Sequence, residues 1–283
     1  METRYCVLYN PLAGTRNGVE SAKKLSGILG GHEIRYVDIT AVTDYQIFFD
    51  SVSADEEIIV AGGDGTLNRF ANEAERFLEG RKIFYYPTGT GNDFLRDIEK
   101  TDSEGPVEIT AYLRNLPSVT VNGVTRKFLN GIGYGIDGYC SEMGEKFREK
   151  STKPINYTSI AIKGMLFSYK STSAEVTVDG ETRFFKNVWL APSMYGRFFG
   201  GGMMPTPNQR RGEKKLSCLV WCGKSRLMTL ALFPKIFSGE HVRHGRSIHI
   251  LEGRSITVKF NRPVALQIDG EVVTNVSSYS TQI

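Results

Sequence analysis

The stretch Ile58-Ile59-Val60-Ala61-Gly62-Gly63-Asp64-Gly65-Thr66-Leu67-Asn68 decides the fold of the first part of the chain. An apolar, β-branched run ends at the glycines and a helix-compatible run follows over residues 67–78. This pattern predicts a buried strand, a tight turn and a helix start. Glycines let the backbone approach an anion closely, and the amide groups at a helix start favour negative charge there. The turn therefore predicts a phosphate site.

Asp64 is the residue of this turn that phosphate binding by itself does not explain. A carboxylate beside phosphate-facing amides would repel the ligand unless a cation lay between them, so Asp64 indicates a Mg²⁺ ion shared with ATP oxygens. The alternative is a tight turn in which the aspartate caps the helix. The pentapeptide leaves both interpretations open.

Two other strand-like runs end in similar turns. The run over residues 82–86 leads into Pro87-Thr88-Gly89-Thr90-Gly91-Asn92-Asp93-Phe94, with glycines, hydroxyl groups and a carboxylate where a helix can begin. The run over residues 5–9 leads into Asn10-Pro11-Leu12-Ala13-Gly14-Thr15. Open α/β folds bind ligands beyond the carboxyl ends of parallel strands, so we expect the three turns to form one binding edge.

The order of the elements predicts two domains. The first alternates strands and helices, which is typical of a doubly wound parallel sheet with helices on both faces. Its expected strands are 4–9, 33–39, 57–61 and 82–86, and its expected helices are 17–30, 43–53 and 66–79.

The second domain is expected to be a mainly antiparallel β-sandwich. Asn122-Gly123 and Asp179-Gly180 are hairpin-turn signals between strand-like runs, and short strands are expected at 247–251, 255–260 and 264–268. Helices are expected at 139–149, 155–169 and 226–237. We place the domains at residues 1–118 and 119–274, with 275–283 able to return to the first domain.

Composition narrows the class of protein. The chain has 283 residues, 40% hydrophobic content and a formal charge of +4 from 35 basic and 31 acidic residues. This balance does not indicate a nucleic-acid binder, and no apolar stretch approaches the length of a transmembrane helix. Met1-Glu2-Thr3-Arg4 leads directly into a strand-like run, so we expect no signal peptide and a cytoplasmic protein. Four cysteines without paired spacing are expected as core thiols: Cys6, Cys140, Cys218 and Cys222.

Several segments, in order, resemble the diacylglycerol kinase catalytic-domain family. They are Asn10-Pro11 with Gly14, Gly62-Gly63-Asp64-Gly65-Thr66 with Asn68 and Asn72, Pro87-Thr88-Gly89-Thr90-Gly91-Asn92-Asp93-Phe94, and Gln267-Ile268-Asp269-Gly270-Glu271. Gly131-Ile132-Gly133-Tyr134-Gly135-Ile136-Asp137 and residues 195–205 resemble two further family segments. Gly-Gly-Asp-Gly-Thr alone is shared with NAD kinases and, loosely, with phosphofructokinases, whereas the ordered set is specific.

The resemblance implies a bacterial-type soluble lipid kinase whose first domain is like that of NAD kinase and phosphofructokinase. Such an enzyme transfers the γ-phosphoryl group of ATP, with Mg²⁺, to the hydroxyl group of a lipid such as diacylglycerol, in phospholipid biosynthesis. The nucleotide would be held by Asn10, Pro11, Gly14, Gly62, Gly63, Asp64, Gly65, Thr66, Asn68, Thr88, Gly89, Thr90 and Asn92, and the metal by Asp64 and Asp93.

The resemblance also makes Glu271 the expected acceptor of the hydroxyl proton, with Asp269 orienting it or sharing a metal contact. The sequence does not order these two carboxylates firmly. Without the resemblance, Asp269-Gly270 is equally well explained as a hairpin turn like Asp179-Gly180.

The chain departs from the family pattern at two places. Asn68 is followed by Arg69, where the family commonly has an acidic residue. Many relatives also carry an acidic structural Mg²⁺ site, whereas the matching segment here is Asn208-Gln209-Arg210-Arg211-Gly212-Glu213-Lys214-Lys215-Leu216. Four cations beside one carboxylate make a poor site for a hard cation, so we expect a Lys or Arg charge in its place.

A lipid substrate implies visits to a membrane surface. Residues 195–205 combine aromatic, glycine and methionine residues suited to a lipid-facing wall, although a tight loop explains them nearly as well. The expected helix over 155–169, with Lys153, Lys163 and Lys170 around it, can meet a membrane interface or pack in the core. A homodimer is compatible with the sequence. The alternatives are a non-catalytic nucleotide- or lipid-binding regulator and, less favoured, an NAD kinase.

Overall fold

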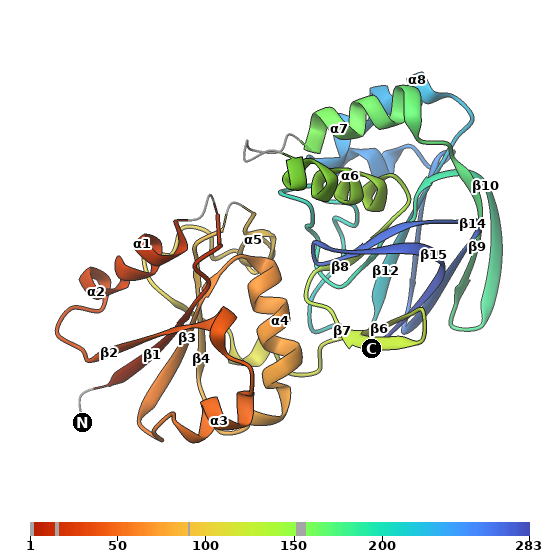
Figure 1. Cartoon of the computed structure of the whole chain (residues 1–283). Helices are drawn as coiled ribbons and strands as arrows, with labels where there is room; N and C mark the ends of the chain where they lie inside the picture. The colour runs from red at the N-terminus through yellow and green to blue at the C-terminus, as the bar shows by residue number, and fades with distance from the viewer. Residues whose placement is uncertain (1–2, 15–16, 90, 151–156) are drawn as a thin grey trace. The chain divides into compact units, whose positions relative to one another are not determined.

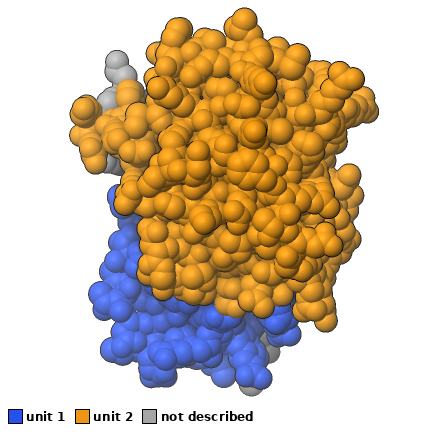
Figure 2. All heavy atoms as spheres, turned by 90° about the vertical axis from the view of Figure 1, so that its right-hand side faces the viewer, with its two compact units in different colours: residues 1–115 blue, residues 116–283 orange. Residues whose placement is uncertain are grey.

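The computed structural model describes residues 3–14, 17–89, 91–150 and 157–283, with the side chain of Thr158 left out. The chain divides into two compact units, residues 1–115 and residues 116–283 (Figure 2). The boundary between the units falls after Asn115, whereas the sequence predicts it after residue 118.

The first unit is built on a five-stranded sheet of order β2-β1-β3-β4-β5 (Figure 1). The strands are β1 (Arg4–Tyr9), β2 (Ile34–Asp38), β3 (Glu56–Gly62), β4 (Ile83–Pro87) and β5 (Val107–Glu108). The first four pair in parallel, and β5 is antiparallel to β4 at the edge. This confirms the doubly wound parallel sheet.

Helices cover this sheet because its strands are apolar on both faces. They are α1 (Gly18–Lys23), α2 (Leu25–Ile28), α3 (Tyr45–Asp50), α4 (Asp64–Ala74) and α5 (Asp93–Asp97), with short 3₁₀ turns at Ile39–Ala41, Glu75–Phe77 and Thr110–Tyr112. Ala22 and Leu25 pack on Val7, Ile59 and Ala61 from one face. The helix expected over 17–30 is divided at Lys24 and ends at Ile28, before Gly30 and Gly31.

The second unit is an antiparallel β-sandwich. Its strands are β6 (Ser118–Val121), β7 (Val124–Lys127), β8 (Gly131–Tyr134), β9 (Thr172–Val178), β10 (Glu181–Leu190), β11 (Ser193–Met194), β12 (Leu216–Cys222), β13 (Ile248–Gly253), β14 (Ser255–Ile268) and β15 (Glu271–Gln282). β14 pairs with β9 through Ile256 to Phe260 and with β8 through Leu266 to Ile268, so it joins both parts of the sheet. Residues 275–282 continue β15, which pairs with β14 and β6 in this unit rather than entering the first.

One strand prediction is wrong in the second unit. Residues 255–260 and 264–268 form the single strand β14 instead of two strands with a turn between them. Asn261 and Pro263 gave the turn signal, because Pro263 lacks an amide donor. The chain accommodates them by register shifts between Lys259 and Val264, so the strand bends without ending.

Helices gather on one side of the sandwich (Figure 1). They are α6 (Ile136–Lys150), α7 (Tyr157–Lys163), the π-helical segment η4 (Gly164–Ser168) and α8 (Arg226–Leu232), with 3₁₀ turns at Phe233–Ile236 and Glu240–Arg243. Their inner residues Ile136, Met165 and Phe233 share a core with Trp189 and Trp221. Among the described residues, no helix is long and apolar enough to cross a membrane.

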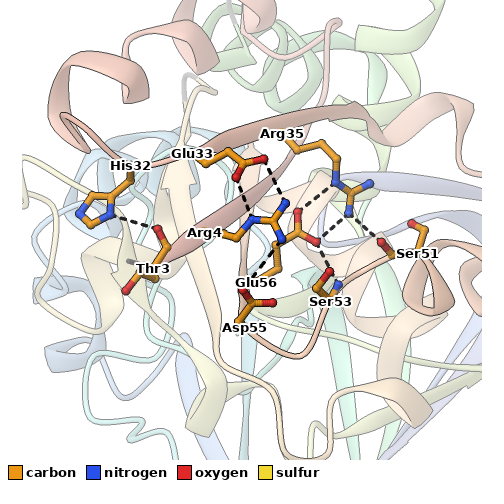
Figure 3. A network of polar contacts seen from close by, with 9 residues as sticks. All are labelled: Thr3, Arg4, His32, Glu33, Arg35, Ser51, Ser53, Asp55 and Glu56. Atoms are coloured by element: carbon orange, nitrogen blue, oxygen red, sulfur yellow. Dashed lines mark hydrogen bonds and ion pairs between the residues drawn. The ribbon is translucent and has the colours of Figure 1, made fainter. Parts of the chain in front are cut away.

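A polar network joins the amino ends of the strands of the first unit (Figure 3). Arg35 Nε and Nη2 donate to Glu56 Oε1 and Oε2 at 3.0 and 3.1 Å, and the Ser53 amide donates to Glu56 Oε2. Arg4 pairs in the same two-pronged way with Glu33. Burial acts to raise the pKa of Glu56, but the Arg35 and Ser53 hydrogen bonds outweigh it and lower the pKa from its usual value of 4.5. This edge of the sheet is therefore held by charge pairs.

Candidate functional site

The three predicted turns meet at the opposite edge, beyond the carboxyl ends of β1, β3 and β4. Asn10 Nδ2 donates to Thr66 Oγ1 at 2.8 Å, so the turn after β1 is bound to the turn after β3. The Thr88 amide donates to the Gly62 carbonyl at 2.9 Å and joins the turn after β4. We expect the three turns at one edge from the sequence, and the structure brings Asn10, Gly62, Thr66 and Thr88 together there.

Glycines allow this close approach. A Cβ on Gly62 would lie 2.5 Å from Thr66 Cβ, and a Cβ on Gly89 would lie 2.8 Å from Gly63 Cα. Gly14 has φ of +63°, and a Cβ there would lie 2.9 Å from the Thr88 carbonyl oxygen. The backbones of all three turns therefore touch through positions without side chains, as a site that presents amides to an anion requires.

Asp64 has a structural contact that neither sequence interpretation named. Its Oδ2 accepts hydrogen bonds from the Asp93 amide at 2.8 Å and the Phe94 amide at 3.4 Å, which are the first amides of α5. Asn92, which precedes α5, makes no side-chain cap of that helix. Asp64 thus caps the helix of the neighbouring turn and fixes the two turns to each other.

The remaining predicted nucleotide residues lie around this edge. Pro11 is half-buried, Gly65 is exposed, and Thr90 lies outside the described residues. Asn68 is buried and its carbonyl accepts a hydrogen bond from Asn72 Nδ2 at 2.9 Å. Arg69, the departure from the family pattern, is paired with Glu73 at 3.0 Å.

Two buried polar atoms distinguish this edge from an ordinary pair of turns. Thr88 Oγ1 and Asn92 Oδ1 are buried and find no hydrogen-bond partner among the described residues. Buried polar side-chain atoms in folded proteins nearly always have a partner, so each exception calls for an explanation. A polar ligand that binds at this edge is such an explanation.

Two carboxylates at this edge are candidate metal ligands. Within the described part of the chain, no cluster of three or more His, Cys, Asp or Glu residues can hold a metal ion. Asp64 and the buried Asp93, which is 4% exposed, are the carboxylates at the two turns. Mg²⁺ is commonly held by one or two carboxylates together with substrate phosphates, so this pair fits an ion that arrives with the nucleotide.

In the second unit, the Asp269-Gly270 turn is anchored by its aspartate. Asp269 has φ of 46° and Gly270 of 94°, the left-handed values of a tight hairpin. Asp269 Oδ1 accepts from the amides of Asn130 at 2.8 Å and Gly131 at 3.0 Å, and Oδ2 accepts from the Leu129 amide at 2.5 Å. Burial raises the pKa of Asp269, while these amides and the Arg211 charge oppose that shift.

The same anchoring recurs at Asp179-Gly180. Asp179 has φ of 47°, and its Oδ1 accepts from the amides of Arg254 at 2.9 Å and Ser255 at 2.8 Å. The two Asp-Gly hairpins therefore share a carboxylate that accepts amides at the start of another strand, β8 for Asp269 and β14 for Asp179. The hairpin-turn interpretation of Asp269 accounts for its contacts, so a catalytic role would come in addition to a structural one.

Arg211 holds the other side of the loop that Asp269 clamps. Its Nη1 donates to the Leu129 carbonyl and its Nη2 to Asn130 Oδ1, both at 2.6 Å, and the guanidinium lies 5.4 Å from the centre of the Tyr195 ring. Glu213, the single acidic residue of that segment, is instead paired with Lys215 at 3.1 Å. Of the cations in 208–216, Arg211 is therefore the one placed where a structural cation would support this loop.

Glu271 is the more accessible of the two predicted catalytic carboxylates. Its side chain is half-exposed and forms an ion pair with Arg126 of β7. Asp269 by contrast accepts three backbone amides through both oxygens.

Asp137 belongs to the same network, although we gave it no role from the sequence. Its Oδ2 accepts from Gln267 Nε2 at 2.9 Å, and Gln267 Oε1 accepts from the Gly270 amide at 2.6 Å, so Asp137 is linked to the Asp269 turn. A Cβ on Gly133 would lie 1.6 Å from Asp137 Oδ2. Burial raises the pKa of Asp137 to about 6, against the Gln267 hydrogen bond, which lowers it. The alternation of glycines at 131, 133 and 135 before an aspartate was the available signal.

The segment at 195–205 adjoins this network. The amides of Tyr195 and Gly196 donate to the Asn130 carbonyl at 2.9 and 3.0 Å. Gly200, Gly201 and Gly202 all have positive φ and turn the chain between the paired residues Phe199 and Met203. A Cβ on Gly200 would lie 4.0 Å from Asp137 Oδ1. The conformation of the segment is that of a tight loop. A lipid-facing role for it stays a proposal, which its position beside Asp137 supports.

Comparison with known proteins follows the division into two units. The model of the diacylglycerol kinase catalytic domain matches residues 4–126, and that of the YegS C-terminal NAD kinase beta sandwich-like domain matches residues 130–282. The chain belongs to the diacylglycerol kinase catalytic-domain family.

Relatives in this family cover most of the chain. A diacylglycerol kinase of Mycobacterium tuberculosis is 25% identical over 257 residues, which are 83% of this chain and 78% of the relative. One from Staphylococcus carnosus is 25% identical over 219 residues, covering 76% and 70%. A crystal structure of a diacylglycerol kinase from Bacillus anthracis superposes with a TM-score of 0.66 at 21% identity, covering 99% of this chain and 94% of that chain, and so shares its fold.

Proposed function

We propose that the chain is a lipid kinase that transfers the γ-phosphoryl group of ATP to the hydroxyl group of a lipid such as diacylglycerol. The observation that carries the proposal is the meeting of three glycine-rich turns at one sheet edge, bound to each other through Asn10, Thr66 and Thr88. Family membership supports the kinase class, and the relatives described above are named as diacylglycerol kinases.

The first unit is proposed to bind the nucleotide. The first residues of α4, from Asp64 to Thr66, lie at this sheet edge, and the amides at a helix start can donate to phosphate oxygens. Asp64 and Asp93 would hold Mg²⁺, which neutralises phosphate charge when it is bound. Asp64 also keeps the two turns together through its contacts with α5.

The second unit is proposed to supply the acceptor chemistry. A proton acceptor needs a carboxylate that the substrate hydroxyl can reach, and the side chain of Glu271 is half-exposed. Asp269 accepts three backbone amides through both oxygens, which favours the role of holding the turn that carries Glu271. Asp137, whose pKa lies near 6, is a further candidate to contact the substrate.

An ATP-consumption assay over a panel of acceptors tests the proposal. The panel should hold diacylglycerol, ceramide, sphingoid bases, phosphatidylglycerol, prenols and NAD, each with Mg²⁺, with the Asp64→Asn variant as the control for contaminating ATPase. We expect turnover that depends on one class of lipid alcohol. Turnover with NAD alone would make the chain an NAD kinase, and no turnover with any acceptor would favour the non-catalytic regulator.

A further inference from the structure

The helical side of the second unit carries large apolar residues on its outer face. α8 packs against η4, which directly continues α7, and Arg226 Nη1 donates to the Met165 carbonyl at 2.7 Å across that contact. Figure 1 shows α7 and α8 side by side above α6. These elements form one continuous surface, which we call the α7–α8 surface.

The residues of the α7–α8 surface divide cleanly between inside and outside. Met165 and Phe233 face the core with Trp189 and Trp221. Phe167 is 79% exposed, Leu227 73% and Met228 59%, and Ile162 is also exposed. The inner residues take part in the core, whereas the outer residues are largely exposed, so core packing does not explain why the outer positions are apolar.

The charge of the surface is of one sign. Residues 157–171 and 214–239 contain no aspartate or glutamate. Lys163, Lys170 and Lys224 are exposed within them. The acidic residues of the neighbouring helix α6 are interspersed with lysine and arginine, and Glu142 is paired with Lys146. An apolar centre rimmed by cations is complementary to a bilayer that has anionic headgroups.

We propose that the α7–α8 surface docks the protein on the surface of an anionic lipid bilayer, with Phe167, Leu227 and Met228 inserted at the headgroup boundary and the three lysines against the headgroups. This proposal rests on the proposed function in one respect: a lipid acceptor lies in a bilayer, so a lipid kinase has to reach the bilayer surface. Docking itself requires neither ATP nor turnover, and it is therefore measured separately.

The test is vesicle co-sedimentation of the full chain without nucleotide. Vesicles of phosphatidylglycerol and phosphatidylcholine in equal parts are compared with vesicles of phosphatidylcholine alone. We expect binding to the anionic vesicles that weakens as salt is raised. Phe167→Ser and Leu227→Ser should each weaken partitioning by about tenfold, because each removes the burial of one large apolar side chain. Lys163→Glu with Lys224→Glu should abolish the preference for anionic vesicles.

The matched control is Phe184→Ser, which removes a side chain 63% exposed on β10, outside the α7–α8 surface. It should bind vesicles like the unaltered chain, and thermal unfolding should confirm that all variants are folded. Equal binding by the Phe167 and Leu227 variants, or no binding by the unaltered chain, would overturn the proposal. Self-association that these two substitutions disperse would overturn it as well, because the surface would then be a protein interface.

A short-chain, water-soluble diacylglycerol separates this proposal from the proposed function. The docking variants should phosphorylate it at the unaltered rate while losing turnover on the vesicle-borne lipid. If the unaltered chain phosphorylates neither lipid, the proposed function fails, whereas the sedimentation result still decides the docking surface.

Discussion

Asp64 combines an observed structural contact with a proposed role in metal binding. Its Oδ2 caps α5 from the turn that begins α4, so removal of the whole side chain and removal of its charge should have different effects. Asp64→Asn keeps an oxygen for the amides of α5 and should leave the melting temperature nearly unchanged, but it should abolish Mg²⁺-dependent transfer. Asp64→Ala should lose turnover and also about 1 kcal/mol of stability. Near-normal turnover of the Asn variant in the ATP assay would remove Asp64 from the metal role.

Arg211 permits a prediction about metal dependence. If its guanidinium stands in for a structural cation, activity should require only the Mg²⁺ that accompanies ATP. Arg211→Ala should lower kcat by about tenfold or more, because two hydrogen bonds from a charged donor to the loop at Leu129 and Asn130 are lost. ATP affinity, measured by calorimetry, should change little. Arg210→Ala is the control, since Arg210 bonds only carbonyls of its own loop in the contacts described, at Pro207 and Gln209.

Metal density beside Glu213, in a crystal soaked with millimolar Mg²⁺ and no nucleotide, would contradict this account of Arg211. Restoration of the Arg211→Ala variant by added guanidinium, but not by added Mg²⁺, would support it.

Substitution of Glu271 and of Asp269, the two carboxylates at the β14–β15 turn, should affect turnover and melting temperature differently. Glu271→Gln keeps the shape of the side chain but cannot take a proton, so kcat should fall by ~10²–10⁴-fold with little change in ATP affinity. Asp269→Asn places an amide group against backbone donors and should lower both turnover and the melting temperature. Asp179→Asn is the matched control, because it makes the same change in the other anchored Asp-Gly turn. It should lower the melting temperature without affecting kcat.

Wild-type kcat in Glu271→Gln, together with an inactive but stably folded Asp269→Asn at every Mg²⁺ concentration, would reverse the assignment. Asp269 would then be the base.

At the scale of elements, strand β8 and helix α6 hold Asp137 in an unfavourable place for a carboxylate. Its pKa is about 6 in the folded chain and 3.8 in the unfolded chain. The carboxyl group therefore lowers the stability of the fold as the pH rises above 3.8, because the unfolded chain loses the proton more readily. Asp137→Asn removes that cost and keeps an oxygen for Gln267 Nε2. The variant should be more stable than the unaltered chain by about 1–3 kcal/mol at neutral pH, and the difference should disappear near pH 4.

Urea unfolding at the two pH values measures this difference, and the acceptor assay should show that the more stable variant turns over more slowly. Gain of stability without loss of turnover would leave Asp137 outside the substrate site.

The elements also show how far the sequence could be interpreted. Strands β1, β3 and β4 of the first unit are predictable because each contains an apolar run that a glycine or proline follows within two residues. The sequence predicts two strands in place of β14, because a proline indicates a turn when the neighbouring strands are not known. The role of Asp137 could not be found, because Gln267, its hydrogen-bond partner, lies 130 positions away and is brought near only by the pairing of β14 with β8.

At the scale of the molecule, the proposed nucleotide site and a charged network lie at opposite ends of the sheet of the first unit. The three glycine-rich turns lie beyond the carboxyl ends of the strands, whereas the Arg35–Glu56 network lies at the amino ends. Glu56 has a lowered pKa, so its contribution to stability is present above about pH 4.5 and is lost as the pH falls through its folded value. Glu56→Gln should cost about 1–3 kcal/mol at neutral pH, and the difference should shrink in acid.

Chemical unfolding over a pH series measures this effect, with Glu57→Gln as the control. Glu57 pairs with the exposed Lys82 at 3.5 Å, so its substitution should cost less than about 0.5 kcal/mol. ATP binding should be unchanged in both variants. Loss of ATP affinity in folded Glu56→Gln would show that the two ends of the sheet are coupled.

The pairing of β14 with both β8 and β9 affects how the second unit folds during synthesis. During synthesis β8 and β9 emerge well before β14, and each then has one neighbour, β11 or β10, and one side that awaits β14. Unpaired strand edges invite pairing with other chains. The sheet therefore cannot close until residues 255–268 have been synthesised, and we expect the edges of β8 and β9 to be open to pairing with other chains until then.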